Sequence, residues 1–205
     1  MNERRGLAAY YLPSPPLREL IWVTAASFLL LIGIGFALAY VRPGSLDPLL
    51  VQFTGAAAEI GLYQVTGWHL MLTILSNNFL ALLLAIALGM IPFLHLPALV
   101  LGFNSLLIGA LGAYYLRSGR GLAAYLAGTL PHGIAEGAAL VLSCAAGLYV
   151  CRATTWSLAG RVDAKTVARV LSEGLRCFTR WVVPLAVLSS LLEAFVTPLL
   201  FSRFL

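Results

Sequence analysis

The sequence has few charged residues, and the shortage is uneven along the chain. Lys, Arg, Asp and Glu make up 10% of the 205 residues, whereas water-soluble domains carry about 25%. No charge lies between Glu19 and Arg42 or between Glu59 and Arg117, which leaves uncharged runs of 22 and 57 residues. These runs exclude an ordinary soluble domain. Each is long enough for membrane-spanning helices, because the bilayer core takes about 20 apolar residues.

The sequence also lacks the cysteine patterns of disulfide-bonded domains and the common catalytic motifs of enzymes. Its three cysteines, Cys144, Cys151 and Cys177, form no CxxC pair, so we interpret them as small apolar packing residues in the reduced state. No HExxH, GxSxG or Ser-Lys pattern occurs. A net charge of +5 without a soluble basic surface argues against a nucleic-acid partner. We therefore predict no cofactor, no catalytic set and the lipid bilayer as the first partner.

The apolar runs divide into five predicted spans. The 57-residue run is too long for one helix, and its middle contains two prolines around a histidine, Ile91-Pro92-Phe93-Leu94-His95-Leu96-Pro97, which indicates a short interfacial turn. The fold class is therefore all-α, a polytopic transmembrane helix bundle that forms a single membrane domain over 1–205. The predicted spans lie near 20–41, 69–91, 97–117, 123–151 and 181–202.

Basic residues orient these spans, because cytoplasmic loops are enriched in Lys and Arg. A cytoplasmic N-terminus places nine basic residues inside and four outside. The inner set is Arg4, Arg5, Arg18, Arg152, Arg161, Lys165, Arg169, Arg176 and Arg180, and the outer set is Arg42, Arg117, Arg120 and Arg203. We therefore expect a multi-pass protein of the cell (plasma) membrane with its N-terminus in the cytoplasm.

Two segments between the spans are expected to lie at the membrane surface. In 42–68, the apolar stretch from Leu49 to Val65 contains Glu59 and is only 17 residues long, which favours a re-entrant or interfacial helix on the outer side. The basic segment 152–180 alternates apolar and basic residues from Arg161 to Arg180. That spacing predicts an amphipathic helix on the cytoplasmic face.

Polar side chains inside the spans carry the functional information, because they are costly in lipid when they have no partner. The candidate interior polar cluster consists of Asn77, Asn78, Asn104, His132, Glu136 and Glu193. His132 and Glu136 lie four residues apart, so they share one face of a helix that follows Pro131 or is broken by it.

Three interpretations of the His132/Glu136 pair remain open. The pair locks helices together through hydrogen bonds, it handles a proton or cation, or it belongs to a catalytic or metal site. A metal needs at least three ligands. His132 and Glu136 supply two, so Glu193 or Glu59 would have to complete the set, and we predict no metal.

Small and amide residues favour close helix contacts. Asn77, Asn78 and Asn104 suit hydrogen bonds between helices, and two small-residue seams suit close packing within one chain or across a homodimer. The seams are Gly102, Ser105, Gly109 and Gly112 in the third span and Gly133-x-x-x-Gly137 in the fourth.

Four motifs follow one another along the chain. They are Asn77-Asn78 with Gly89, Asn104 with Gly109, Pro131-His132-Gly133-x-x-Glu136 with Cys144-Ala145-Ala146-Gly147-Leu148, and Glu193-Ala194-Phe195-Val196-Thr197-Pro198. In this order they resemble the stage II sporulation protein M family, also called the DUF95 integral membrane proteins. The resemblance covers about residues 70 to 200. One departure is Asn104-Ser105, where the family usually has Asn-Gly.

The resemblance implies a membrane component without assigned chemistry. The family's namesake acts in the engulfment machinery of endospore formers with peptidoglycan-degrading partners, but relatives in bacteria and archaea without spores mean that sporulation does not carry over. The leading hypothesis is thus a non-enzymatic scaffold that binds protein partners in the membrane. The alternatives are a channel or transporter with a polar site at His132, Glu136 and Glu193, and an intramembrane hydrolase that uses Glu136 and His132.

Overall fold

A computed structural model describes residues 17–59 and 65–204 of the chain, and this part contains helices and no strand. Within these residues, five helices are long and apolar enough to cross a membrane: Leu17–Val41, Gly67–Met90, Leu96–Arg117, Leu122–Leu158 and Ala164–Phe204. The prediction of an all-α polytopic bundle with five spans is therefore confirmed. Arg4 and Arg5, which contribute to the predicted orientation, lie outside the described residues.

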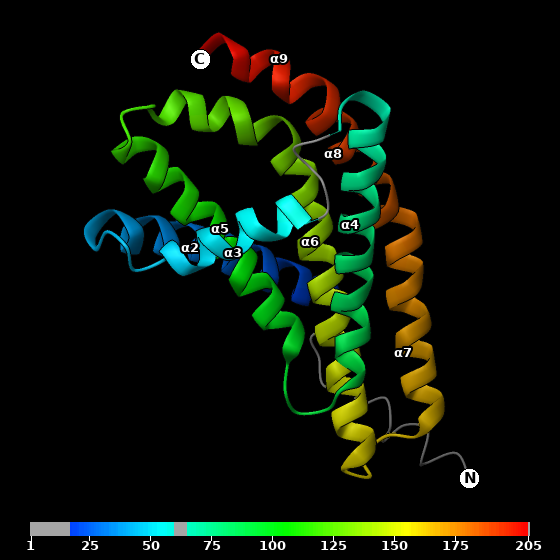
Figure 1. The fold of residues 1–205 in the computed structure, drawn as a ribbon. Coiled ribbons are helices and arrows are strands. Elements are labelled where there is room, and N and C mark those ends of the chain that lie inside the picture. The colour runs from blue at the N-terminus through cyan, green and yellow to red at the C-terminus, as the bar shows by residue number, and fades with distance from the viewer. Residues whose placement is uncertain (1–16, 60–64, 205) are drawn as a thin grey trace.

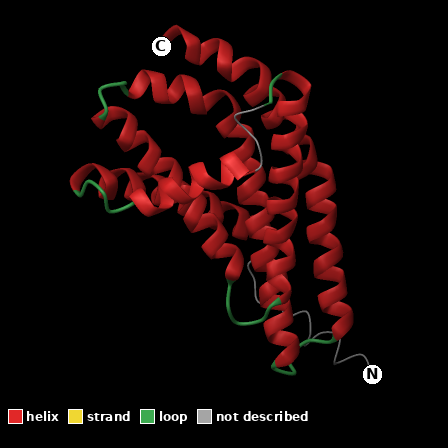
Figure 2. Ribbon diagram, viewed as in Figure 1, coloured by secondary structure: helices red, strands yellow, loops and turns green. Residues whose placement is uncertain are grey.

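The helices follow one another with short connections (Figures 1 and 2). The first four are α2 (Leu17–Val41), α3 (Asp47–Glu59), α4 (Gly67–Ala87) with the 3₁₀ turn η1 (Leu88–Met90), and α5 (Leu96–Arg117). After α6 (Leu122–Leu158), the fifth span consists of α7 (Ala164–Cys177), the π turn η2 (Phe178–Val182), α8 (Val183–Leu191), the π turn η3 (Leu192–Val196), α9 (Thr197–Phe201) and η4 (Ser202–Phe204).

Helix α6 is the centre of the bundle. It contacts α2, α4, α5, α7, α8 and α9, and most of its apolar stretch is buried, unlike that of the other spans. Most of α6, α4 and the fifth span run side by side, whereas α2 and α5 form a pair inclined to them (Figure 1). Large apolar side chains such as Trp22, Leu29 and Leu80 stay exposed on the outside, as expected of surfaces that face lipid.

Glycine allows two of these helix pairs to touch backbone to backbone. A Cβ at Gly109 of α5 would overlap the Ile32 carbonyl oxygen of α2, and a Cβ at Gly147 of α6 would overlap the Ala85 carbonyl oxygen of α4. The expected seams are thus only partly used. Gly102 has open space around its Cβ position, and Gly133 meets only Thr129 of its own helix.

The ends of α6 and of the fifth span differ from the predicted boundaries of 151 and 181. Helix α6 continues to Leu158, because the basic Arg152 does not stop a helix. The helix ends just before Gly160, whose φ of 70° lies in the left-handed region that is common after the last turn of a helix. Asp163 then caps α7 by accepting a hydrogen bond from the Thr166 backbone N–H at 2.9 Å. Because α7 packs on α6 and runs without a break into η2 and α8, the amphipathic segment is the first part of the fifth helical span.

Helix α3 is the counterpart of the predicted outer helix. Its 13 residues correspond to a length of about 20 Å, which is less than the hydrocarbon core of about 30 Å. It packs against α5. Its length supports the prediction of a re-entrant or interfacial helix, although residues 60–64 of the same segment lie outside the described part.

Candidate functional site

Helix α6 presents His132 and Glu136 on one face, one helical turn apart. Pro131 lies inside the helix, and α6 changes direction in its N-terminal third (Figure 1). A proline removes one backbone hydrogen bond and its ring crowds the preceding turn, so it accounts for a bend at this point. The helix that carries His132 and Glu136 therefore does not begin after Pro131 but continues through it, with a bend.

Glu193 comes from the other side of the site, in η3 of the fifth span. A π turn is wider than an α-helical turn and often occurs at functional sites. Four residues further on, Thr197 contacts the site too: its Oγ1 lies 3.0 Å from Nδ1 of His132, within hydrogen-bond distance. The bend in α6 and the wide turn in the fifth span together direct these side chains toward one another.

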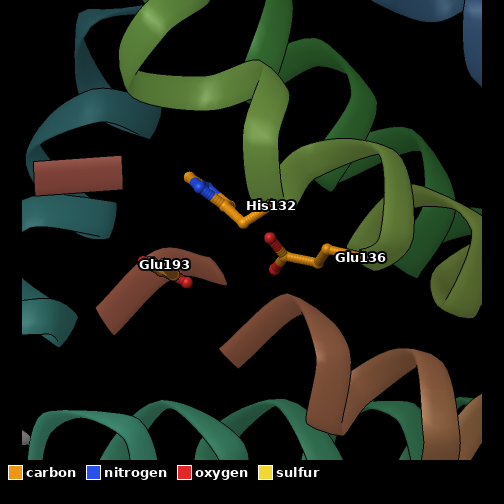
Figure 3. Close-up of side chains that lie close together, drawn as sticks. All are labelled: His132, Glu136 and Glu193. Atoms are coloured by element: carbon orange, nitrogen blue, oxygen red, sulfur yellow. The ribbon is translucent and has the colours of Figure 1, made fainter. Parts of the chain in front are cut away.

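The three titratable groups meet in one cluster, which we call the HEE cluster (His132, Glu136 and Glu193). One ligand atom from each residue lies within 4.8 Å of the other two, and all three residues are partly buried. Figure 3 shows His132 and Glu136 projecting from α6 toward the segment that carries Glu193. Asn78 of α4 joins from a third direction, since its Nδ2 donates to Oε1 of Glu136 at 3.4 Å.

The cluster lies near the middle of the bundle rather than at its end. Asn78 is eleven residues from Gly67 and nine from Ala87, so its bond to Glu136 places the cluster at the mid-depth of α4. Water does not solvate polar groups at that depth. This geometry places Glu136 and Glu193 in one polar cluster at the depth of the middle of α4.

In the described part of the chain, the negative charges of the two carboxylates in the cluster are not neutralised by a neighbouring Lys or Arg. Among the described residues, no Lys or Arg lies close enough to act on either carboxylate. Carboxylate oxygens of Glu136 and Glu193 lie within 4.8 Å of each other, and two ionised carboxylates at that separation repel each other by roughly 3 kcal/mol at an effective dielectric constant of about 20. Such a pair is stable when it shares a proton or binds a cation. The arrangement is therefore chemically suited to hold a proton, to bind a cation or to orient a water molecule.

Two of the six predicted residues form no hydrogen bond with the HEE cluster. Asn104 donates from Nδ2 to the Val100 carbonyl oxygen of its own helix at 2.8 Å. Asn77 is exposed on the outside of α4. The structure thus brings together Asn78, His132, Glu136 and Glu193, and it adds Thr197, which was not among the predicted residues. The sequence signal that could have identified Thr197 is its spacing of four residues from Glu193, which places both side chains on one helix face.

Comparison with models of protein families identifies the family to which the chain belongs. The model of the family described as "Stage II sporulation protein M" matches residues 24–198, which include every residue of the HEE cluster. The chain belongs to the stage II sporulation protein M family. Searches of curated proteins and of solved structures find no match.

The family assignment and the five apolar helices together make this stage II sporulation protein M homologue an integral membrane protein. The match also covers both bent elements of the site. It begins at residue 24, within α2, and ends at residue 198, one residue after Thr197. Within this family member, the site thus belongs to the common body of the fold and not to an added segment.

Proposed function

We propose that this protein is a non-enzymatic scaffold of the membrane, and that it binds another transmembrane helix through the outer face of α4. The observation that carries the proposal is Asn77. This residue is exposed and lies ten residues from Gly67 and ten from Ala87, at the midpoint of the α4 helix. An amide at that depth faces hydrocarbon unless another helix covers it.

The neighbours of Asn77 form a shallow groove, with both polar and apolar side chains, along the same side of the helix. This α4 outer face consists of His69, Leu72, Thr73, Ser76, Asn77 and Leu80. Thr73 and Ser76 satisfy their hydroxyl groups by donating to carbonyl oxygens of their own helix, at 2.9 and 2.8 Å. Within residues 17–59 and 65–204, the Asn77 amide has no hydrogen-bond partner. Asn77 is thus the group on this face whose hydrogen bonds require a second helix.

A second copy of the chain fits this requirement. The amide of Asn77 is both a donor and an acceptor, so two copies related by a twofold axis can exchange reciprocal hydrogen bonds between their Asn77 side chains. Interhelical hydrogen bonds of this kind contribute about 0.6–2 kcal/mol each. Small and hydroxyl residues beside Asn77 allow the two α4 helices to approach closely. A self-associating protein of this kind can then present several copies of its surface to other membrane partners.

Cysteine cross-linking in membranes tests this interface. In a cysteine-free background, Ser76→Cys is expected to give a disulfide-linked dimer under mild oxidation, and Asn77→Leu in the same chain is expected to reduce it. The matched control is Leu29→Cys, which is 68% exposed near the middle of α2. Equal cross-linking at Ser76 and Leu29, or no effect of Asn77→Leu, would contradict the proposed face.

The orientation of the chain belongs to the same proposal. We infer a plasma-membrane location with a cytoplasmic N-terminus. The α4–α5 and α6–α7 connections lie at one end of the molecule, and the described C-terminal residues lie at the other (Figure 1). The α6–α7 connection is flanked by Arg152, Arg161 and Lys165, which favours the cytoplasmic side for that end. Labelling of Arg161→Cys from outside intact cells is expected to fail, and efficient labelling would reverse the orientation.

Proton or cation transport is a second candidate function, which the HEE cluster favours. Two carboxylates and an imidazole in the middle of a bundle are a typical arrangement on ion pathways. If the protein transports protons or cations, purified protein in liposomes conducts them and Glu136→Gln abolishes the flux. A folded wild-type protein that shows no flux under a gradient would leave the scaffold as the function.

A further inference from the structure

We propose that the HEE cluster binds a divalent transition-metal ion, and that Zn²⁺ is the ion that its ligands fit. This site goes beyond the scaffold function and does not depend on it. It is formed by residues from two separate elements, α6 and η3, so the ion would tie the bent part of α6 to the wide turn of the fifth span.

The charge of the cluster favours a divalent ion. Glu136 and Glu193 together carry two negative charges when ionised, and no Lys or Arg in the described part of the chain acts on either of them. A single shared proton leaves one negative charge in an apolar bundle, where an isolated charge is costly. A doubly charged ion bound by two carboxylates and a neutral imidazole gives a net charge of zero.

The ligand atoms favour zinc among the divalent ions. Mg²⁺ and Ca²⁺ prefer sites made of oxygen ligands alone, whereas an imidazole nitrogen suits transition metals. Zinc accepts a set of one histidine and two carboxylates, and sites with three protein ligands keep a fourth position for water. Zn–N and Zn–O bonds of about 2.0–2.2 Å place tetrahedral ligand atoms about 3.4 Å apart. The present separations of up to 4.8 Å therefore require side-chain movements of only about 1 Å.

Two further contacts hold the ligands in the way that metal sites need. Thr197 Oγ1 lies 3.0 Å from Nδ1 of His132 and fixes the orientation of the ring, and the Asn78 amide donates to Glu136. Ligating histidines and carboxylates are typically held by a second hydrogen bond of this kind, which orients them and sets which ring nitrogen carries the proton. Asn78 and Thr197 are therefore positioning residues for the ion.

Zinc binding to the purified full chain tests the site. The protein is purified in detergent through a tag without histidine, treated with EDTA and titrated with Zn²⁺. We expect one Zn²⁺ per chain, affinity lowered by at least about tenfold in Glu193→Gln, and a loss of about tenfold in Thr197→Val. His95→Asn is the control, because it removes an exposed histidine that belongs neither to the cluster nor to the α4 outer face, and it is expected to leave the affinity unchanged.

X-ray absorption of the zinc-loaded wild-type protein provides a test that needs no variant. The expected first shell contains only nitrogen and oxygen at about 2.0–2.2 Å, without sulfur at about 2.3 Å. Three results would overturn the proposal: no stoichiometric zinc binding by the folded wild-type protein, a first shell that includes a cysteine sulfur, or equal affinity in folded Glu193→Gln. None of them bears on self-association through Asn77, so the two proposals fail separately.

Discussion

Replacement of Glu193 by Gln is predicted to have opposite effects on stability in the absence and presence of zinc. Glutamine keeps the size of the side chain and removes its charge. Because the ligand atoms of the HEE cluster lie within 4.8 Å of one another, two ionised carboxylates repel by roughly 3 kcal/mol at an effective dielectric constant of about 20. In EDTA at alkaline pH, Glu193→Gln is therefore expected to raise the free energy of unfolding by up to about that amount.

In the presence of zinc, the wild-type protein is expected to be more stable than Glu193→Gln. An ion that binds only the folded wild-type protein adds about 2.7 kcal/mol at a concentration of a hundred times its dissociation constant, and the variant lacks a ligand. The assay is unfolding in mixed micelles, followed by far-UV circular dichroism, with Glu59→Gln as a control on an exposed carboxylate outside the cluster. A Glu193→Gln protein that is less stable than wild type in EDTA at alkaline pH would refute the reasoning, because it would mean that the second carboxylate is stabilising without an ion.

Three further predictions test individual contacts. Gly109→Ala is expected to lower the free energy of unfolding by about 1–3 kcal/mol, because the added Cβ would meet the α2 backbone. Gly102→Ala is the control: its Cβ would meet nothing within 4 Å, so the substitution is expected to be neutral or slightly stabilising. Asn78→Leu is expected to lower the stability of the detergent-solubilised chain by about 1 kcal/mol, since Glu136 loses its amide donor, whereas Asn77→Leu is not. Hydrogen bonds from Thr166 hold the pKa of Asp163 below its usual value, so its support of α7 is present at neutral pH and is lost as the pH falls through the lowered pKa. The hydrogen-exchange protection factors of the first turn of α7, which correct for the slower intrinsic exchange in acid, are expected to fall at acid pH in wild type and not in Asp163→Asn.

The fold class follows from the sequence because charge-free runs and basic loops are strong signals in membrane proteins. The number of spans and the family were predicted correctly for that reason. The ends of the helices were less predictable. A basic residue such as Arg152 marks the edge of the lipid, but it does not end a helix, so α6 and α7 extend beyond the apolar runs.

The site was only partly predictable, because adjacent residues on a helix point in directions about 100° apart. The sequence treats Asn77 and Asn78 alike, whereas the structure directs Asn78 to Glu136 and leaves Asn77 outside. Similarly, Gly102 and Gly109 both belong to one seam by spacing, and only Gly109 lies where α5 crosses α2. Which face is inside depends on the packing of all five spans, and no local pattern contains that information.

Self-association in lipid vesicles tests the proposed function most directly. Energy transfer between donor- and acceptor-labelled chains, measured as the lipid-to-protein ratio increases, gives the dimerisation constant of wild type and of Asn77→Leu. We predict a wild-type dimer and an association weakened by roughly 3- to 30-fold in the variant, which corresponds to about 0.6–2 kcal/mol. A monomeric wild-type protein, or a dimer of equal strength in Asn77→Leu, would contradict the proposal that the α4 outer face binds a second copy.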